Sequence, residues 1–198
     1  MDSGTQHTDK ELWDSFRAGS RIAYEQIYGL YVRTLYNYGY KIAQDRPLVE
    51  DCIQDVFLNL LEYRDRLSPT TSIKFYLFRA IRREIVRRLR ESNRFESDAE
   101  PAFHALFEVE ASWLDSQVGR DQIDDLLKAL NQLPARQKEA IHLRFFDNLS
   151  YEEVASVMGI EQTSAYKIIY KALDNLQKRV TFNVVVLLLG LTGQASSH

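Results

Sequence analysis

The sequence contains few of the residues that build disulfides, metal sites and tight turns. It has one cysteine, Cys52, which excludes an intramolecular disulfide. Its four histidines are scattered along the 198 residues and are not grouped at the spacing of metal ligands. Eight glycines and four prolines leave long stretches without a helix breaker. We therefore expect a cytoplasmic protein that carries no metal and no other cofactor.

The chain also lacks an apolar segment long enough to span a membrane. The stretch VVVLLLGL at 184–191 is eight residues long, whereas a transmembrane helix needs about 20. The N-terminal residues MDSGTQHTDK are polar and contain no apolar core of an export signal. We expect the 184–191 stretch either to pack on the preceding domain or to dock a partner.

Excess charge of either sign is small. Lys and Arg total 25 and Asp and Glu total 28, a net charge of −3, which excludes a uniformly basic protein that coats nucleic acid. The basic residues are nevertheless concentrated at 71–94, where eight of them stand against two acidic residues and give a net charge of +6. Any nucleic-acid site therefore has to be local.

The apolar residues recur at spacings of three and four along most of the chain, which predicts an all-α protein. We expect two small helical bundles, at 10–93 and 119–181, joined by a linker at 94–118 and followed by a tail at 182–198. In the first bundle, helices are expected over about 12–40, 48–67 and 73–90. The core-facing stripe of the third helix is predicted to be Phe75, Phe78, Ile81, Ile85 and Leu89.

The linker is acidic. Residues 95–115 include six acids and neither Lys nor Arg. The same segment contains Phe103, Phe107 and Trp113, which argues against a wholly solvated tether. We expect it to settle on a surface of this chain or of a partner.

Arginines recur along one side of the predicted 73–90 helix. Arg79, Arg83, Arg87 and Arg90 are spaced by four, four and three residues, which stacks their guanidinium groups on one face. Like charges so arranged repel, and a polyanion that neutralises them would remove the repulsion. The pattern indicates a nucleic-acid surface, and the alternative is an ordinary solvated helix face.

A small polar loop at 67–72 precedes this helix, and the aromatic residues Phe75, Tyr76 and Phe78 follow it. Stacking of a flipped base on an aromatic side chain contributes roughly 1 to 3 kcal/mol, which is comparable to the cost of extracting the base from a duplex. The loop and the aromatic residues could hold an unstacked base, or the aromatic residues could belong to the core.

A helix-turn-helix is predicted near the C-terminus. Ser150 and Glu153 form an S-x-x-E capping box that starts a short helix, and Gly159 permits a sharp turn before a second helix. In such motifs the start of the second helix enters the major groove. Its expected buried stripe is Ala165, Ile168, Ile169, Ala172, Leu173 and Leu176. The residues expected to face outward are Thr163, Ser164, Tyr166, Lys167, Tyr170 and Lys171.

Within this motif we assign Ser164, Tyr166 and Lys167 to base edges or the adjacent backbone, and Lys171 with Arg144 to phosphates. The alternative is a helical hairpin that touches only protein.

Over about residues 10–180 the sequence resembles the extracytoplasmic-function (ECF) sigma factors, small specificity subunits of bacterial RNA polymerase. AYEQIYGLYVRTLYNYGYKIAQD is similar to the opening helix of that family, and VEDCIQDVFLNLLEYRDRL to its helix that binds the polymerase clamp. FYLFRAIRREIVRRLRES resembles its promoter-melting helix, and LPARQKEAIHLRFFDNLSYEEVASVMGI leads into its helix-turn-helix.

The resemblance implies that the first bundle melts the minus-ten element, that the second reads the minus-thirty-five element, and that both dock on core RNA polymerase. It also implies an anti-sigma partner, and a linker that threads into polymerase. The residues implied for polymerase binding are Asp51, Gln54, Asp55, Phe57 and Leu61. Those implied for minus-ten DNA are Lys74, Tyr76, Arg79, Arg82, Arg83 and Arg87. Those implied for minus-thirty-five DNA are Arg144, Thr163, Ser164, Tyr166, Lys167, Tyr170 and Lys171.

The function expected from these features is promoter-specific transcription initiation together with core RNA polymerase, with promoter DNA as the other partner and no small-molecule substrate. An enzyme is not expected, because no nucleophile-base pair, glycine-rich phosphate loop or metal cluster can be assembled from the sequence. The alternative is a stand-alone helix-turn-helix regulator with an N-terminal sensor or dimerisation bundle. The basic helix favours the sigma factor, because a sensor bundle has no need of it.

Overall fold

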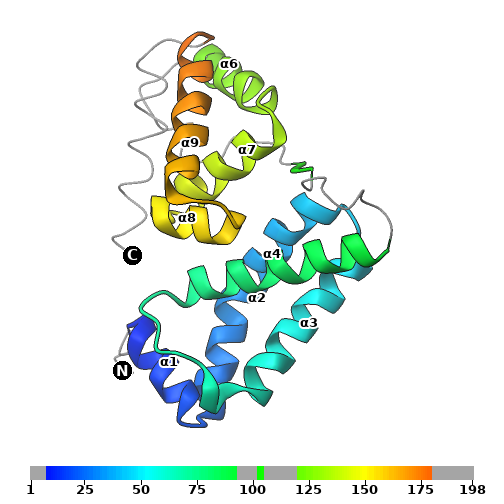
Figure 1. The fold of residues 1–198 in the computed structure, drawn as a ribbon, viewed down its shortest axis with the longest axis vertical. Coiled ribbons are helices and arrows are strands. Elements are labelled where there is room, and N and C mark those ends of the chain that lie inside the picture. Colours follow the sequence, from blue (N-terminus) through cyan, green and yellow to red (C-terminus); the bar gives the residue numbers. More distant parts are fainter. Residues whose placement is uncertain (1–7, 93–101, 105–119, 180–198) are drawn as a thin grey trace. The chain divides into compact units, whose positions relative to one another are not determined.

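The computed structural model describes residues 8–92, 102–104 and 120–179, and every regular element in these ranges is helical (Figure 1). The prediction of an all-α fold is thereby confirmed. The chain divides into two compact units, 1–101 and 102–198, and each unit is described by itself. The predicted tail and nearly all of the predicted linker lie outside the described residues. Among the helices described, none is long and apolar enough to cross a membrane.

The first unit begins with two helices where one was predicted. Helix α1 (Asp9–Arg17) and helix α2 (Arg21–Ala43) are separated because Gly19 has a φ of 95° and the side chain of Ser20 caps α2. That φ lies in the left-handed region, which glycine enters at little cost. The prediction of a continuous helix over 12–40 is therefore wrong at this point.

Helix α3 (Arg46–Glu62) starts with Asp45 as N-cap and Pro47 in its first turn. It ends five residues before the predicted boundary at 67, and a short 3₁₀ turn, η1 (Arg64–Arg66), follows. Helix α4 (Ile73–Glu91) follows its N-cap Ser72, and its bounds lie within one residue of the predicted 73–90. Helices α2, α3 and α4 pack against one another and form the core of the unit.

The three core helices come into close contact at Gly39 of α2. A Cβ atom at this position would lie 2.8 Å from Ile85 Cδ1 of α4 and 3.0 Å from Val49 Cγ1 of α3. The stripe of α4 that faces this contact runs in steps of four residues, so Leu77 belongs to it and Phe75 falls beside it. Phe75 is half-buried, which corrects its predicted place in the core. The buried apolar residues of α4 are Ile73, Leu77, Phe78, Ile81, Ile85 and Leu89.

The second unit contains α6 (Arg120–Asn131), α7 (Ala135–Ile141), a π-helical turn η2 (His142–Phe146), α8 (Tyr151–Met158) and α9 (Gln162–Gln177). The capping box predicted at Ser150 and Glu153 is present, with both reciprocal hydrogen bonds formed. Gly159 ends α8 with a φ of 66°, as the predicted sharp turn requires. Helices α8 and α9 thus form the predicted helix-turn-helix.

Candidate nucleic-acid and polymerase interfaces

The exposed face of α4 presents Arg79, Arg83, Arg87 and Arg90, as the spacing predicts. Arg87 is bound by two carboxylates of its own helix, with Nη2 2.5 Å from Glu84 Oε1 and Nη1 2.6 Å from an oxygen of Glu91. Arg79 and Arg83 form no ion pair with any residue that the structure describes. The repulsion expected along the row is therefore relieved at Arg87, and Arg79 and Arg83 remain available to an anion.

Arg82 differs from the other arginines of this helix. It is buried, with 8% of its surface exposed, and it follows the core residue Ile81 directly. Its burial corrects its predicted place on the DNA-facing side. Lys74 and Tyr76, which were also assigned to minus-ten DNA, are half-buried at the start of the helix.

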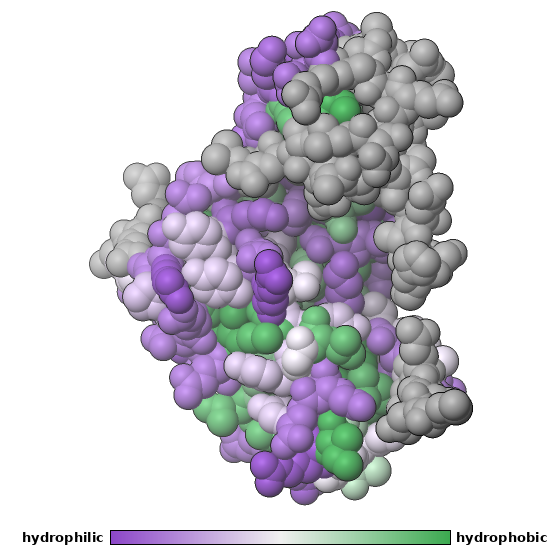
Figure 2. All heavy atoms as spheres, turned by 180° about the vertical axis from the view of Figure 1, so that it is seen from behind, coloured by the Kyte–Doolittle hydropathy of each residue, from purple (hydrophilic) through white to green (hydrophobic). Residues whose placement is uncertain are grey.

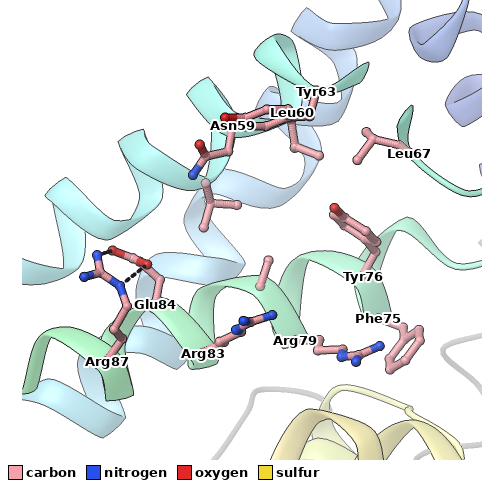
Figure 3. A pocket seen from close by; sticks show the side chains of 12 residues that line it. Asn59, Leu60, Tyr63, Leu67, Phe75, Tyr76, Arg79, Arg83, Glu84 and Arg87 are labelled. Carbon is pink, nitrogen blue, oxygen red and sulfur yellow. Dashed lines mark hydrogen bonds and ion pairs between the residues drawn. The ribbon is translucent and has the colours of Figure 1, made fainter. Parts of the chain in front are cut away.

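A cavity of about 360 Å³ lies between the end of α3, the loop after η1 and the first half of α4 (Figure 3). Tyr76 points from α4 toward Leu67 of the loop, and Arg79 and Arg83 follow it along the helix. Burial raises the pKa of Tyr76, so its hydroxyl stays protonated at neutral pH. The cavity is lined by Val56, Asn59, Leu60, Tyr63, Leu67, Phe75, Tyr76, Arg79, Ala80, Arg83, Glu84 and Arg87.

Two of the three aromatic residues proposed to hold a base line this cavity, and one does not. Phe75 and Tyr76 are lining residues, and apolar side chains beside them give a flat ligand a surface to stack on. Phe78 is fully buried and packs on Tyr38 with ring centroids 4.7 Å apart. Phe78 is therefore a core residue, as its place on the predicted core-facing stripe requires, and of the two alternatives for this side chain the core is the one observed.

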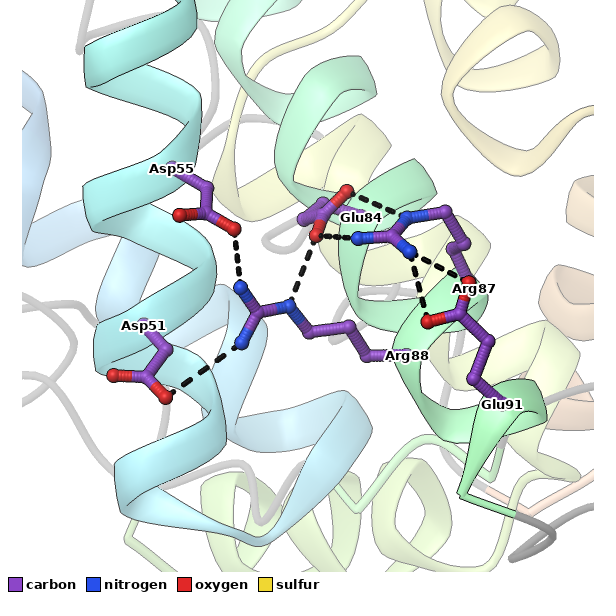
Figure 4. A network of polar contacts seen from close by, with 6 residues as sticks. All are labelled: Asp51, Asp55, Glu84, Arg87, Arg88 and Glu91. Atoms are coloured by element: carbon purple, nitrogen blue, oxygen red, sulfur yellow. Dashed lines mark hydrogen bonds and ion pairs between the residues drawn. The ribbon is translucent and has the colours of Figure 1, made fainter.

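Two acidic residues of α3, Asp51 and Asp55, face α4. Arg88 of α4 reaches between Asp51 and Asp55 of α3, with Nη1 3.6 Å from Asp51 Oδ2 and Nη2 paired with Asp55 (Figure 4). The Nε of Arg88 donates to Glu84 over 2.9 Å, so Glu84 joins this group to Arg87. The hydrogen bonds from Arg87 are the main cause of a lowered pKa of the Glu84 carboxyl. Six ionic side chains thereby form one connected network.

The remaining residues assigned to polymerase binding do not all lie on the surface. Gln54 and Leu61 are exposed. Phe57 is 2% exposed and packs edge-on against Tyr28, with ring centroids 4.8 Å apart, so its predicted role as a direct contact is corrected. Leu58, one residue later, is 54% exposed and was missed. A residue next to a predicted anchor differs from it by 100° around the helix, and only the packed neighbours decide which of the two is covered.

A groove of about 670 Å³ is lined by side chains of α2 and α3 and lies on a different side of α3 from Arg88. Tyr28 and Phe57 form part of its wall, and Arg33 and Arg46 give it basic edges. Figure 2 shows patches of apolar surface on the first unit that interrupt a largely hydrophilic exterior. The large apolar side chains exposed on this unit include Ile22, Tyr28, Leu30, Tyr40, Leu58, Leu61 and Tyr63.

In the helix-turn-helix, the start of α9 has the exposure that was predicted for a recognition helix. Thr163, Tyr166, Lys167, Tyr170 and Lys171 are exposed, and Ser164 is half-buried. The inner face is narrower than predicted. Ala165, Ile169, Ala172 and Leu176 are buried, whereas Ile168 and Leu173 are half-buried at its border.

Arg144 is anchored beside this surface. Its Nη1 donates to the backbone oxygen of Leu149 over 3.2 Å, and its guanidinium lies 5.1 Å from the centre of the Tyr151 ring. Tyr151 in turn stacks on Tyr166 of α9, with ring centroids 4.3 Å apart and planes at 14°. These contacts tie η2 to both helices of the motif, so Arg144 has a structural role that its assignment to phosphate did not include.

A buried polar pair that spans η2, from His142 to Asp147, was not anticipated. His142 Nε2 lies 3.4 Å from Asp147 Oδ2, and both side chains are about nine-tenths buried. The His142 ring also stacks on Phe146, with centroids 5.5 Å apart. The π-helical turn that brings His142 to Asp147 follows α7 directly, and its sequence, HLRFF, continues an ordinary helical pattern, so no local signal could have revealed it.

Comparison with known proteins matches each of the two units to a region of the same protein family. The Sigma-70 region 2 family matches residues 27–95, and the Sigma-70, region 4 family matches residues 123–176. The chain is 21% identical over 154 residues to the ECF RNA polymerase sigma factor SigM of Bacillus subtilis, covering 77% of this chain and 92% of that protein.

The chain is also 30% identical over 173 residues to the ECF RNA polymerase sigma factor BldN of Streptomyces coelicolor, covering 85% of this chain but 64% of that protein. The fold resembles that of the sigma factor RpoE in complex with the anti-sigma factor NepR from Bartonella quintana. That match has a TM-score of 0.50 at 24% identity and covers 78% of this chain and 94% of that one.

The matched regions, one in each helical unit, do not favour a stand-alone regulator, because the N-terminal bundle is itself a sigma region and not a sensor. This chain belongs to the ECF family of sigma factors, which bind core RNA polymerase and direct it to initiate transcription at specific promoters.

Proposed function

We propose that the exposed face of α4 and the cavity beside it open the minus-ten element. Arg79 and Arg83 bind the phosphates, because both are exposed and neither pairs with a described carboxylate. An unstacked base enters the cavity between Tyr76 and Leu67 and stacks on aromatic surface, which is worth roughly 1 to 3 kcal/mol. Capture of the base then offsets part of the cost of unpairing it.

Residues at the start of α9 read the minus-thirty-five element in this proposal. Ser164, Tyr166 and Lys167 approach base edges, and Lys171 approaches a phosphate. Thr163 and Tyr170 flank them on the same exposed side. Arg144 contributes chiefly by holding Tyr151, and through it Tyr166, in place.

Core polymerase binds the surface of α3. Asp51, Gln54 and Asp55 offer polar and acidic groups, and exposed Leu58 and Leu61 offer apolar anchors beside them. Acidic residues around apolar anchors suit a basic partner surface. Phe57 is buried beneath this surface, where it packs on Tyr28.

In this proposal each predicted domain has its own role. Residues 10–93 bind polymerase and melt the promoter, 119–181 bind the minus-thirty-five element, and the acidic linker at 94–118 enters polymerase. The protein works in the cytoplasm, without chemistry of its own, and an anti-sigma factor holds it inactive. RpoE of Bartonella quintana, which has been solved with an anti-sigma factor, supports that last step.

The observation that carries this proposal is the juxtaposition of Arg79 and Arg83, which pair with none of the described carboxylates, with a cavity lined by aromatic side chains on one face of α4. Run-off transcription with purified core polymerase on a genomic fragment library tests it. The holoenzyme should recover promoters with a shared sequence, and permanganate should detect unpaired thymines in their minus-ten segments. Promoters that stay closed in the presence of both proteins would refute it.

A further inference from the structure

Helix α1 precedes the residues matched to Sigma-70 region 2, which begin at residue 27. It is a well-defined helix, because Thr8 and Glu11 form a complete capping box at its start. Its inner face buries Leu12, Trp13 and Phe16. The family match does not include this helix, and none of the predicted contact residues lies on it.

Trp13 joins α1 to two walls of the cavity beside α4. Its indole Nε1 donates a hydrogen bond of 2.9 Å to the backbone oxygen of Ser68, in the loop that carries Leu67. Its ring packs on Tyr76, with centroids 5.0 Å apart. The side chain is completely buried, although Ser68 itself is exposed. A single side chain of α1 therefore sets the position of the loop relative to the aromatic residue across from it.

Asp9 fixes the other end of the same loop. Its Oδ2 accepts a hydrogen bond of 2.8 Å from the backbone N–H of Ile73, the first residue of α4. This N–H has no partner within its own helix, and a carboxylate is favoured at a helix N-terminus. The hydroxyl of Tyr31 donates to the other oxygen of Asp9 over 3.2 Å. Burial, and then the charge of Asp9, raise the pKa of Tyr31, so this donor keeps its proton.

We infer that α1 is a positioning element for base capture and that Trp13 is its main positioning residue. The inference rests on the proposed role of the cavity. A loop fixed at Ser68 and at Ile73 has already lost the conformational freedom that binding would otherwise cost, so the cavity accepts a base without first having to order its wall. Trp13 contacts no nucleic acid in this scheme and acts through Ser68 and Tyr76 alone.

The test uses the full chain with purified core polymerase and compares wild type with Trp13→Phe. Phenylalanine keeps an aromatic ring against Tyr76 and removes the donor to Ser68. The probe is a single-stranded oligonucleotide with the non-template minus-ten sequence of a promoter recovered by run-off transcription. We expect the affinity of the holoenzyme for this probe to fall about tenfold, the upper range for one hydrogen bond, while affinity for core polymerase stays unchanged.

Ile42→Val is the matched control, because Ile42 is a buried residue of α2 that does not line the cavity. It should leave both affinities unchanged. Equal binding of the oligonucleotide by wild type and Trp13→Phe overturns the inference, and so does a parallel loss of polymerase affinity, which would mean a general structural role. If wild type fails to bind any minus-ten strand, the proposed role of the cavity itself fails.

Discussion

Asp55 of α3 forms an ion pair with Arg88 of α4, two residues that are 33 positions apart in the sequence. The pair connects the helix proposed to bind polymerase with the helix proposed to melt DNA. Its partners are partly exposed, with 40% of the Asp55 side chain and 25% of the Arg88 side chain accessible, so its contribution to stability is below about 1 kcal/mol. Its larger effect is to orient the Asp55 carboxylate on the surface of α3.

Asp55→Asn should weaken binding to core polymerase by at least about fivefold, or ~1 kcal/mol, because it removes the acidic group from a surface expected to meet a basic partner. The amide keeps the size of the side chain, so the thermal midpoint should hardly change. Glu25→Gln is the control, since it also removes the acid of an exposed pair, with Arg21, but on α2. Co-purification with core polymerase and calorimetry measure the two effects. Equal polymerase binding by both variants would remove Asp55 from the interface.

Arg83→Ala should reduce the salt dependence of promoter binding by the holoenzyme. Each phosphate that is neutralised on duplex DNA contributes about 0.9 to the slope of log affinity against log salt concentration, so the slope should become shallower by about one. Arg21→Ala, which removes an exposed arginine of α2, should leave the slope unchanged. Fluorescence anisotropy over a series of salt concentrations gives both slopes, and identical slopes would place Arg83 away from the DNA.

Gly39→Ala should destabilise the first unit by about 1–3 kcal/mol, because the new methyl group would overlap Ile85 and crowd Val49. Gly29→Ala provides a sharp contrast within the same helix. A Cβ at Gly29 meets no atom within 4 Å, so alanine there should stabilise by about 0.5–1 kcal/mol through its higher helix propensity. Urea denaturation followed by circular dichroism measures both changes. Two shifts of the same sign would contradict the close approach of α2, α3 and α4.

Lys167→Ala should lower promoter-specific transcription by about fivefold to tenfold, the effect of losing one polar contact to DNA, without changing the affinity for polymerase. Lys178→Ala is the control, because Lys178 is an exposed lysine beyond the end of α9 and pairs with Asp174 over 2.6 Å. Run-off transcription and polymerase binding are measured side by side. A loss of both activities in Lys167→Ala would indicate misfolding of the helix-turn-helix instead of a lost DNA contact.

Most helix boundaries of this protein follow from short-range signals. Ser72 caps α4, Ser150 and Glu153 cap α8, and Gly159 ends it, and all of these were readable because capping depends on residues within one turn. The break between α1 and α2 also has a local cause, the positive φ of Gly19. It was missed because the helical spacing of apolar residues continues from one helix into the next.

The errors at the candidate sites have a different origin. Phe57 and Arg82 are buried although both were assigned to an exposed surface, and whether such a residue is covered depends on how neighbouring helices cross. The link from Trp13 to Ser68 spans 55 residues, so no local pattern contains it. Short-range chemistry therefore predicted the elements, and long-range packing decided which side chains each element presents.

Glu84 accepts hydrogen bonds from both Arg87 and Arg88. Arg87 also pairs with Glu91, and Arg88 with Asp55, so several carboxylates together reduce the uncommitted positive charge that α4 displays. With these acids in place, Arg79 and Arg83, beside the cavity, are among the arginines of α4 that pair with no described carboxylate. A helix without these acids would present more uncommitted arginines and would bind polyanions with less regard to their sequence. A limited amount of uncommitted positive charge suits a protein that has to dissociate from most of the DNA sequences it encounters.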